Sequence, residues 1–128
     1  MWRRRQELAT LETDVLVLSF EPLERVRWYL AEVDFGWPVL ADPERAIYRA
    51  YGLGRASTLR AWFSPRTVRF YLGALIHGKV PRRPQGDTHQ LGGDFIIDEA
   101  GLIRFAHRSV EPADRPSVDS LVRLLKSL

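Results

Sequence analysis

The sequence predicts an α/β domain that ends in a β-hairpin and a final helix. Short apolar runs alternate with segments of helical periodicity over the first two thirds of the chain. Two further strand-like runs follow, joined by four residues of which the last is Gly. The chain has 128 residues, of which 45% are apolar, and this size suits one domain. We therefore expect a single domain over residues 1–128 with the element order α-β-α-β-α-α-β-β-α.

The first half of the chain supplies two helices and two extended segments. Residues 2–12 have apolar side chains three apart among charged ones, which predicts a helix. Residues 15–20 form a β-branched apolar run, typical of a strand buried on both faces in a parallel sheet. A second amphipathic helix is predicted over residues 22–33, and residues 37–40 are predicted to be extended.

The middle of the chain contains two Pro-initiated helix starts. Asp42 and Pro43 predict a helix that begins there, with Asp42 as its cap and Gly52 as its end. Ser64 and Pro65 predict another, which ends at Gly78 and has four apolar side chains along one stripe: Val68, Leu72, Leu75 and Ile76. The polar residues 79–90 are predicted to form a loop.

The last third is the most regular. Residues 95–97 and 102–106 are predicted strands, joined through residues 98–101 as an antiparallel hairpin. Residues 114–116 are predicted to open the last helix, in which Val118, Leu121, Val122 and Leu125 recur at helical spacing.

Composition excludes several classes of site. The chain has no Cys, which removes disulfides, Cys-ligated zinc, iron–sulfur clusters and thiol mechanisms. No apolar run approaches the ~20 residues needed to span a bilayer, and nothing at the start resembles a signal peptide. We therefore expect a cytoplasmic protein without a membrane span.

Positive charge is concentrated in the middle of the chain. The net charge is +3, but residues 45–86 contain no acidic side chain and nine basic ones: Arg45, Arg49, Arg55, Arg60, Arg66, Arg69, Lys79, Arg82 and Arg83. Trp62, Phe63, Phe70 and Tyr71 lie among them. Such a mixture suits nucleic acid or an anionic surface, although core aromatics with solvated arginines explain it too, and we favour that second interpretation.

In residues 38–53, PVLADPERAIYRAYGL, Pro-Val-Leu leads into Asp-Pro and a predicted helix ending in Tyr-Gly. Residues 92–109, GGDFIIDEAGLIRFAHRS, contain the predicted hairpin. These two motifs resemble the corresponding helix-start segment and hairpin of the peroxiredoxin-like branch of the alkyl hydroperoxide reductase/thiol-specific antioxidant (AhpC/TSA) family. The resemblance covers the chain from Glu7 onward. It implies a thioredoxin-like, peroxiredoxin-type central sheet with flanking helices.

The sequence also departs from the family pattern. The family places a redox Cys at the N-terminus of the helix before the strand at residues 15–20, where the helix dipole favours the thiolate. Here that helix is residues 2–12, and Met1 lies partway along it, so we expect the first core strand and the cysteines to be absent. The arginine that supports the thiolate is replaced by Gly92 and Gly93. The resemblance therefore implies an antioxidant-lineage domain that is incomplete at its N-terminus and has no thiol-peroxidase activity as this chain.

A missing central strand leaves strand edges without partners, and such edges recruit other chains. We expect either a homodimer or other self-association that covers the edges, or a rearranged sheet in which residues 15–20 pair with residues 95–97. A third interpretation is that the natural gene starts upstream and includes the missing strand and cysteines.

One polar cluster is the best candidate for a residual binding site, because the resemblance places it beside the former redox centre. Its members lie in the loop and at the hairpin: Asp87, Thr88, His89, Gln90, Asp94 and Arg108. A solvated polar loop is the simpler explanation. The three histidines, His77, His89 and His107, lack metal-ligand spacing, and no serine has a nucleophile motif, so we expect no metal, cofactor or catalytic residue.

Two functions remain open at this point. The chain is either an antioxidant-family protein, inactive without cysteine, or a non-catalytic binding or interaction module. The module would use the basic segment 45–86, the polar loop 86–94 or the exposed sheet.

Overall fold

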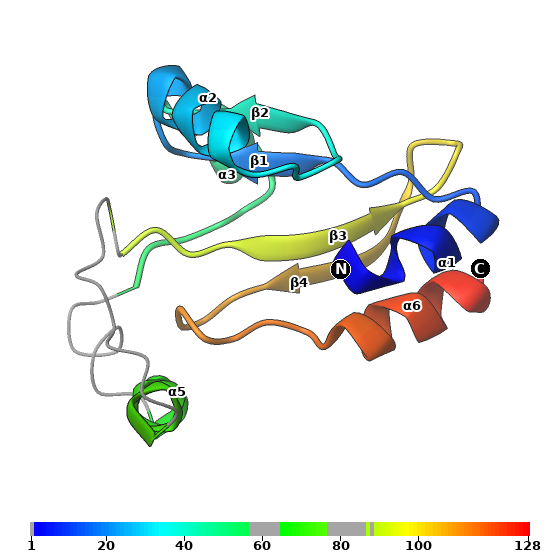
Figure 1. The fold of residues 1–128 in the computed structure, drawn as a ribbon. Helices are drawn as coiled ribbons and strands as arrows, with labels where there is room; N and C mark the ends of the chain where they lie inside the picture. Colours follow the sequence, from blue (N-terminus) through cyan, green and yellow to red (C-terminus); the bar gives the residue numbers. More distant parts are fainter. Residues whose placement is uncertain (1, 57–64, 77–86, 88) are drawn as a thin grey trace. The chain divides into compact units, whose positions relative to one another are not determined.

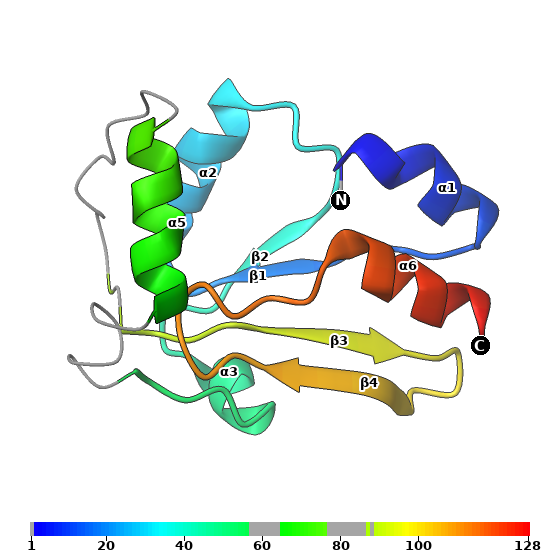
Figure 2. The ribbon, with the colours of Figure 1, turned by 90° about the horizontal axis from the view of Figure 1, so that it is seen from below.

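The computed structural model describes residues 2–56, 65–76, 87 and 89–128, and their contacts form two compact units (Figures 1 and 2). The first unit consists of Met1–Ile47 and Ser117–Leu128, and the second consists of Tyr48–Pro116. Helices are combined with small sheets, so the predicted α/β class is confirmed. Each unit is described by itself.

The two ends of the chain meet in the first unit. A 3₁₀ turn, η1 (Trp2–Arg4), leads into α1 (Arg5–Thr10), and α6 (Val118–Lys126) lies beside α1 in both ribbon views. Both helices bury apolar side chains: Leu8 of α1 and Val122 of α6 are each only 2% exposed. The predicted helix at residues 2–12 is confirmed, whereas α6 begins at Val118 rather than at residues 114–116.

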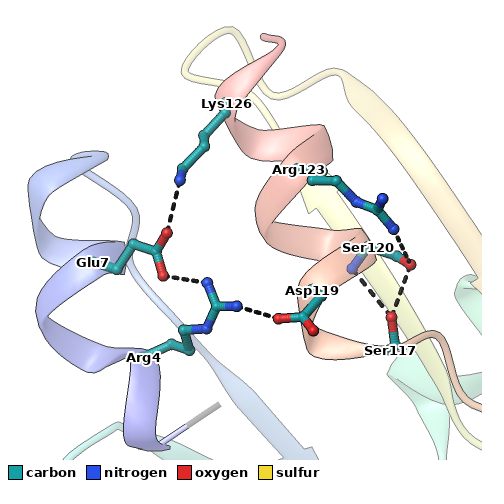
Figure 3. A network of polar contacts seen from close by, with 7 residues as sticks. All are labelled: Arg4, Glu7, Ser117, Asp119, Ser120, Arg123 and Lys126. Atoms are coloured by element: carbon teal, nitrogen blue, oxygen red, sulfur yellow. Dashed lines mark hydrogen bonds and ion pairs between the residues drawn. The ribbon is translucent and has the colours of Figure 1, made fainter.

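A chain of ion pairs joins these two helices (Figure 3). Glu7 Oε1 lies 2.8 Å from Lys126 Nζ, and Glu7 Oε2 lies 2.5 Å from Arg4 Nη1. Arg4 also binds Asp119 at the start of α6. Four side chains at the two ends of the sequence therefore form one continuous polar contact. The cap of α6 is Ser117, whose Oγ accepts a 3.1 Å bond from the Ser120 N–H.

The first sheet consists of two parallel strands. β1 (Val17–Ser19) pairs with β2 (Val39–Ala41), with Val17 opposite Val39, and α2 (Leu23–Glu32) connects them. The predicted parallel strand at residues 15–20 is confirmed but shorter. Its predicted burial on both faces is wrong, because all three residues of β1 are half-buried and Leu16 is 57% exposed.

The helix after β2 starts later than the sequence predicts. α3 runs over Ala46–Ala50, because residues 43–45 form a turn in which Arg45 adopts a φ of 57°. Asp42 nevertheless caps it as expected. Its two carboxylate oxygens each accept a 2.9 Å bond, from the N–H groups of Ala46 and Ile47, and the side chain is buried.

The second unit contains a helix and the hairpin. α5 spans Pro65–Ile76, whereas the predicted start at Ser64 and end at Gly78 lie outside the described residues. β3 (Gly93–Ile97) and β4 (Ile103–Arg108) are antiparallel, with Gly93 opposite Arg108 and a bulge between Ile96 and Ile97. The hairpin prediction is confirmed.

The hairpin turn follows from its own residues. Asp98 Oδ1 accepts a 2.9 Å bond from the Leu102 N–H, and Gly101 adopts a φ of 79°, which a side chain would disfavour. Asp98 Oδ2 also binds Arg104 Nε at 2.6 Å. These hydrogen bonds fix the register of the two strands.

The described strands form two two-stranded sheets, β1–β2 in the first unit and β3–β4 in the second. The rearranged sheet, in which residues 15–20 would pair with residues 95–97, would join the two units and stays a prediction, because a strand has two edges and pairing with β2 or β4 uses only one of them.

Candidate functional site

Asp87 organises the polar loop of the second unit. Its carboxylate holds the Arg55 guanidinium through two contacts of 2.5 and 3.2 Å, which is the bidentate geometry of strong charge-assisted pairs. Its Oδ1 also accepts a 3.1 Å bond from the His89 N–H. The sequence groups Asp87 with its neighbours, but its main partner, Arg55, is 32 residues away.

Gln90 fastens the same loop to the backbone. Its Nε2 donates 3.0 Å bonds to the carbonyl oxygens of Gly54 and Leu91. The main chain is paired there as well: the Leu91 N–H donates to the Gly54 oxygen, and the Ala56 N–H donates to the His89 oxygen. Ala56 and Leu91 are buried together. The loop is thus closed onto residues 54–56, and Thr88 lies outside the described residues.

Asp94 lies on the hairpin, directly opposite His107. Its Oδ2 is 3.3 Å from Arg115 Nε, which is an ion-pair distance. The same oxygen is buried and lacks a hydrogen bond of good geometry, so the pair is held by charge rather than by a directed bond. Arg115 therefore provides the positive charge next to this carboxylate.

Asp114 stabilises the turn after β4 through its main chain and its carboxylate. The oxygen of the Asp114 main chain accepts a 2.6 Å bond from Ser109 Oγ, and its carboxylate accepts a 3.0 Å bond from the Val110 N–H. His107 Nε2 is 3.4 Å from the same carboxylate. The sequence predicts residues 114–116 as the start of the last helix and does not indicate that Asp114 or Arg115 belongs to a polar cluster at the hairpin.

Arg108 belongs to the other face of the hairpin. Side chains alternate along a strand, so Asp94 points away from the face shared by Gly93 and Phe95. Arg108, opposite Gly93, places its guanidinium 5.3 Å from the centre of the Phe95 ring and donates a 2.6 Å bond to the Tyr51 oxygen. Asp94 and Arg108 therefore belong to separate clusters, and Asp87, His89 and Gln90 form a third.

The backbone leaves no space for a side chain at Gly93, whereas at Gly92 the neighbouring atoms are the movable end of the Arg115 side chain. A Cβ at Gly93 would lie 2.6 Å from the His107 carbonyl oxygen. A Cβ at Gly92 would collide with the Arg115 guanidinium. At these positions, where the resemblance places an arginine, the described structure brings in Arg115 from the turn after β4, and Arg115 is paired with Asp94.

Among the described residues, no three His, Asp or Glu side chains gather as a metal-ion site. None of the helices within residues 2–56, 65–76 and 89–128 is long and apolar enough to cross a membrane.

Comparison with known proteins gives one match. The model of the AhpC/TSA antioxidant enzyme family matches residues 1–111, which is most of the chain. Neither the curated proteins nor the solved structures contain a significant match.

Proposed function

Because this chain belongs to the AhpC/TSA antioxidant enzyme family, we propose that it is a member of that lineage without thiol-peroxidase activity of its own. The absence of cysteine from all 128 residues carries the proposal. Thiol peroxidases attack the peroxide O–O bond with a thiolate, which is oxidised to a sulfenic acid and then reduced by a second thiol. No other side chain in this chain supplies that recyclable nucleophile.

The surroundings of Gly92 and Gly93 support the same proposal. A positively charged side chain beside a thiol lowers its pKa and favours the thiolate. Gly93 lacks the space for a charged side chain, and the guanidinium that lies next to Gly92 belongs to Arg115, which is paired with Asp94. This geometry suits a structural ion pair better than a thiolate-binding position.

A peroxide-consumption assay tests the proposal. Purified chain with hydrogen peroxide or an organic hydroperoxide and excess dithiothreitol should consume peroxide at the rate of the protein-free mixture. Circular dichroism on the same sample establishes that the protein is folded. A rate that rises in proportion to the protein concentration would overturn the proposal.

We also propose that the chain self-associates through its sheets as a homodimer or larger assembly. Each described sheet has only two strands, and two-stranded sheets are marginal without further partners. Light scattering coupled to gel filtration, over a wide range of concentration, should give a mass above one chain. Leu40→Lys on β2 should lower that mass, while Leu128→Lys, at an apolar position that is even more exposed, should not. A monomer at every concentration would contradict this proposal.

A binding role is the alternative function, with two candidate segments. In the polar loop, the Asp87 carboxylate accepts a hydrogen bond from Arg55, and the Gln90 side chain donates to two main-chain oxygens. These contacts argue for a structural role of the loop. The basic segment 45–86 offers a more specific observation, developed below. The sequence prediction of a cytoplasmic location stays part of the proposal, and fractionation of cells that express the chain would test it.

A further inference from the structure

Three apolar side chains of α5 are exposed along one face of the helix. Val68, Leu72 and Ile76 are 41%, 52% and 82% exposed, and they recur every four residues along the helix. Arg69 and Pro65 are exposed on the same face, because positions 65, 68, 69, 72 and 76 fall within about a third of a helical turn. The apolar stripe that the sequence predicts therefore includes three side chains that the structure exposes.

This apolar face lies within the most basic part of the chain. α5 itself contains Arg66 and Arg69 and no acidic residue. Residues 45–86 as a whole contain nine basic side chains and no acidic one, although the chain has 16 acidic residues in total. An apolar stripe within an acid-free basic segment has the composition of a helix that lies in the interface of a membrane.

Charge and apolar area together select the partner. A second copy of α5 would bring two basic segments together, so charge opposes self-association through this helix. A nucleic acid would neutralise the charge but would leave Val68, Leu72 and Ile76 in water. An anionic lipid surface matches both the positive charge and the apolar side chains. Its phosphates attract the arginines, and the boundary of its acyl chains buries the apolar stripe.

We propose that α5 binds the surface of anionic bilayers, lying in the plane of the membrane with Val68, Leu72 and Ile76 toward the acyl chains. At 12 residues the helix is about 18 Å long, too short to span the bilayer. Binding is thus peripheral and reversible. The proposal does not depend on the absence of peroxidase activity, and either can fail without the other.

Because the chain lacks cysteine, a single introduced cysteine can be labelled without background. Ile76→Cys is labelled with nitrobenzoxadiazole, and Leu128→Cys, which is also highly exposed, is the matched control. Each is titrated with vesicles of phosphatidylcholine alone and with vesicles that also contain phosphatidylserine. We expect a blue shift and a gain in intensity only for the label at position 76, only with phosphatidylserine, and reversed by high salt.

Substitutions on the helix separate the apolar from the charged contribution. Leu72→Asp should weaken vesicle binding by about tenfold or more, because it removes a leucine that the acyl chains would bury and adds a negative charge. Leu128→Asp adds the same charge outside α5 and should leave binding nearly unchanged. Arg69→Ala should weaken binding about fivefold, the effect of one basic residue near an anionic surface.

Four outcomes would overturn the proposal. The first is a label at position 76 that does not respond to phosphatidylserine vesicles. The second is a response to a DNA or RNA duplex in place of vesicles, which would assign the helix to nucleic acid. The third is a fluorescence change of the label at position 76 when only the protein concentration is raised, which would assign the helix to self-association. The fourth is vesicle binding that Leu72→Asp and Leu128→Asp weaken equally.

Discussion

The guanidinium carbon of Arg108 lies 5.3 Å from the centre of the Phe95 ring, on one face of the hairpin. The same guanidinium donates a 2.6 Å bond from Nε to the carbonyl oxygen of Tyr51, and the Tyr51 ring meets Phe95 edge-on with centroids 4.8 Å apart. One side chain at the end of β4 thus holds the segment that follows α3 against the hairpin. This arrangement indicates a structural role for a residue that the sequence suggested as part of a binding site.

We expect Arg108→Ala to lower the free energy of unfolding by about 1–2 kcal/mol, measured by urea denaturation. The substitution removes both the contact with the Phe95 ring and the bond to the Tyr51 oxygen. Arg104→Ala is the control on the same strand, because its only described bond is an exposed one to Asp98, and it should cost at most about 1 kcal/mol. A larger loss for Arg104→Ala than for Arg108→Ala would contradict the assignment.

Gly93→Ala should destabilise the hairpin by about 1–3 kcal/mol, the usual cost of overpacking. The new Cβ would lie 2.6 Å from the His107 carbonyl oxygen and 2.6 Å from a Leu53 methyl carbon, and the backbone oxygen has no freedom to move. Gly54→Ala is the matched control, since its Cβ would meet nothing within 4 Å. It should be neutral or slightly stabilising. Equal urea midpoints for the two variants would argue against this packing.

Local signals predicted the parts of the fold that local interactions determine. The turn at residues 98–101 was predictable because Asp98 and Gly101 supply its bonds and its positive φ themselves. The cap by Asp42 was predictable for the same reason. The start of α3 was not, because Asp42 reaches past a turn with Arg45 at φ 57°, and propensity alone favours a helix directly after Pro43.

The partners of the candidate site residues could not be predicted from the sequence. Asp87, His89 and Gln90 are neighbours in the sequence and in the structure, but the partner that determines their role is the distant Arg55. Strand alternation separates Asp94 from Arg108, which a list of nearby polar residues does not reveal. The spacing of residues 68, 72 and 76 predicts an apolar stripe but does not indicate whether it faces protein or solvent.

Ser117→Ala should lower the free energy of unfolding by about 1 kcal/mol, because it removes the cap of α6. The Ser117 Oγ accepts the Ser120 N–H at 3.1 Å, and alanine would leave that donor without its side-chain partner. Ser117→Asp is the conservative variant, since its carboxylate can accept the same bond and suits a helix N-terminus. It should retain most of the stability in thermal or urea unfolding. Loss of stability in both variants alike would show that the hydroxyl has another role.

The ion pairs between α1 and α6 predict a pH-dependent contribution from Glu7. The hydrogen bond from Lys126, followed by that from Arg4, holds the pKa of the Glu7 carboxyl below its ordinary value of 4.5. Because the pKa of Glu7 is lower in the folded state, the ionised carboxylate stabilises the fold above pH 4.5. This stabilisation is lost as the pH falls through the folded-state pKa of Glu7. The difference in unfolding free energy between the native chain and Glu7→Gln should therefore be largest near neutral pH and shrink toward zero on acidification. Urea denaturation across that range measures it, and high salt, which screens these partly exposed pairs, should reduce the difference at neutral pH. A difference that grows as the pH falls would contradict the pairing of Glu7 with Lys126 and Arg4.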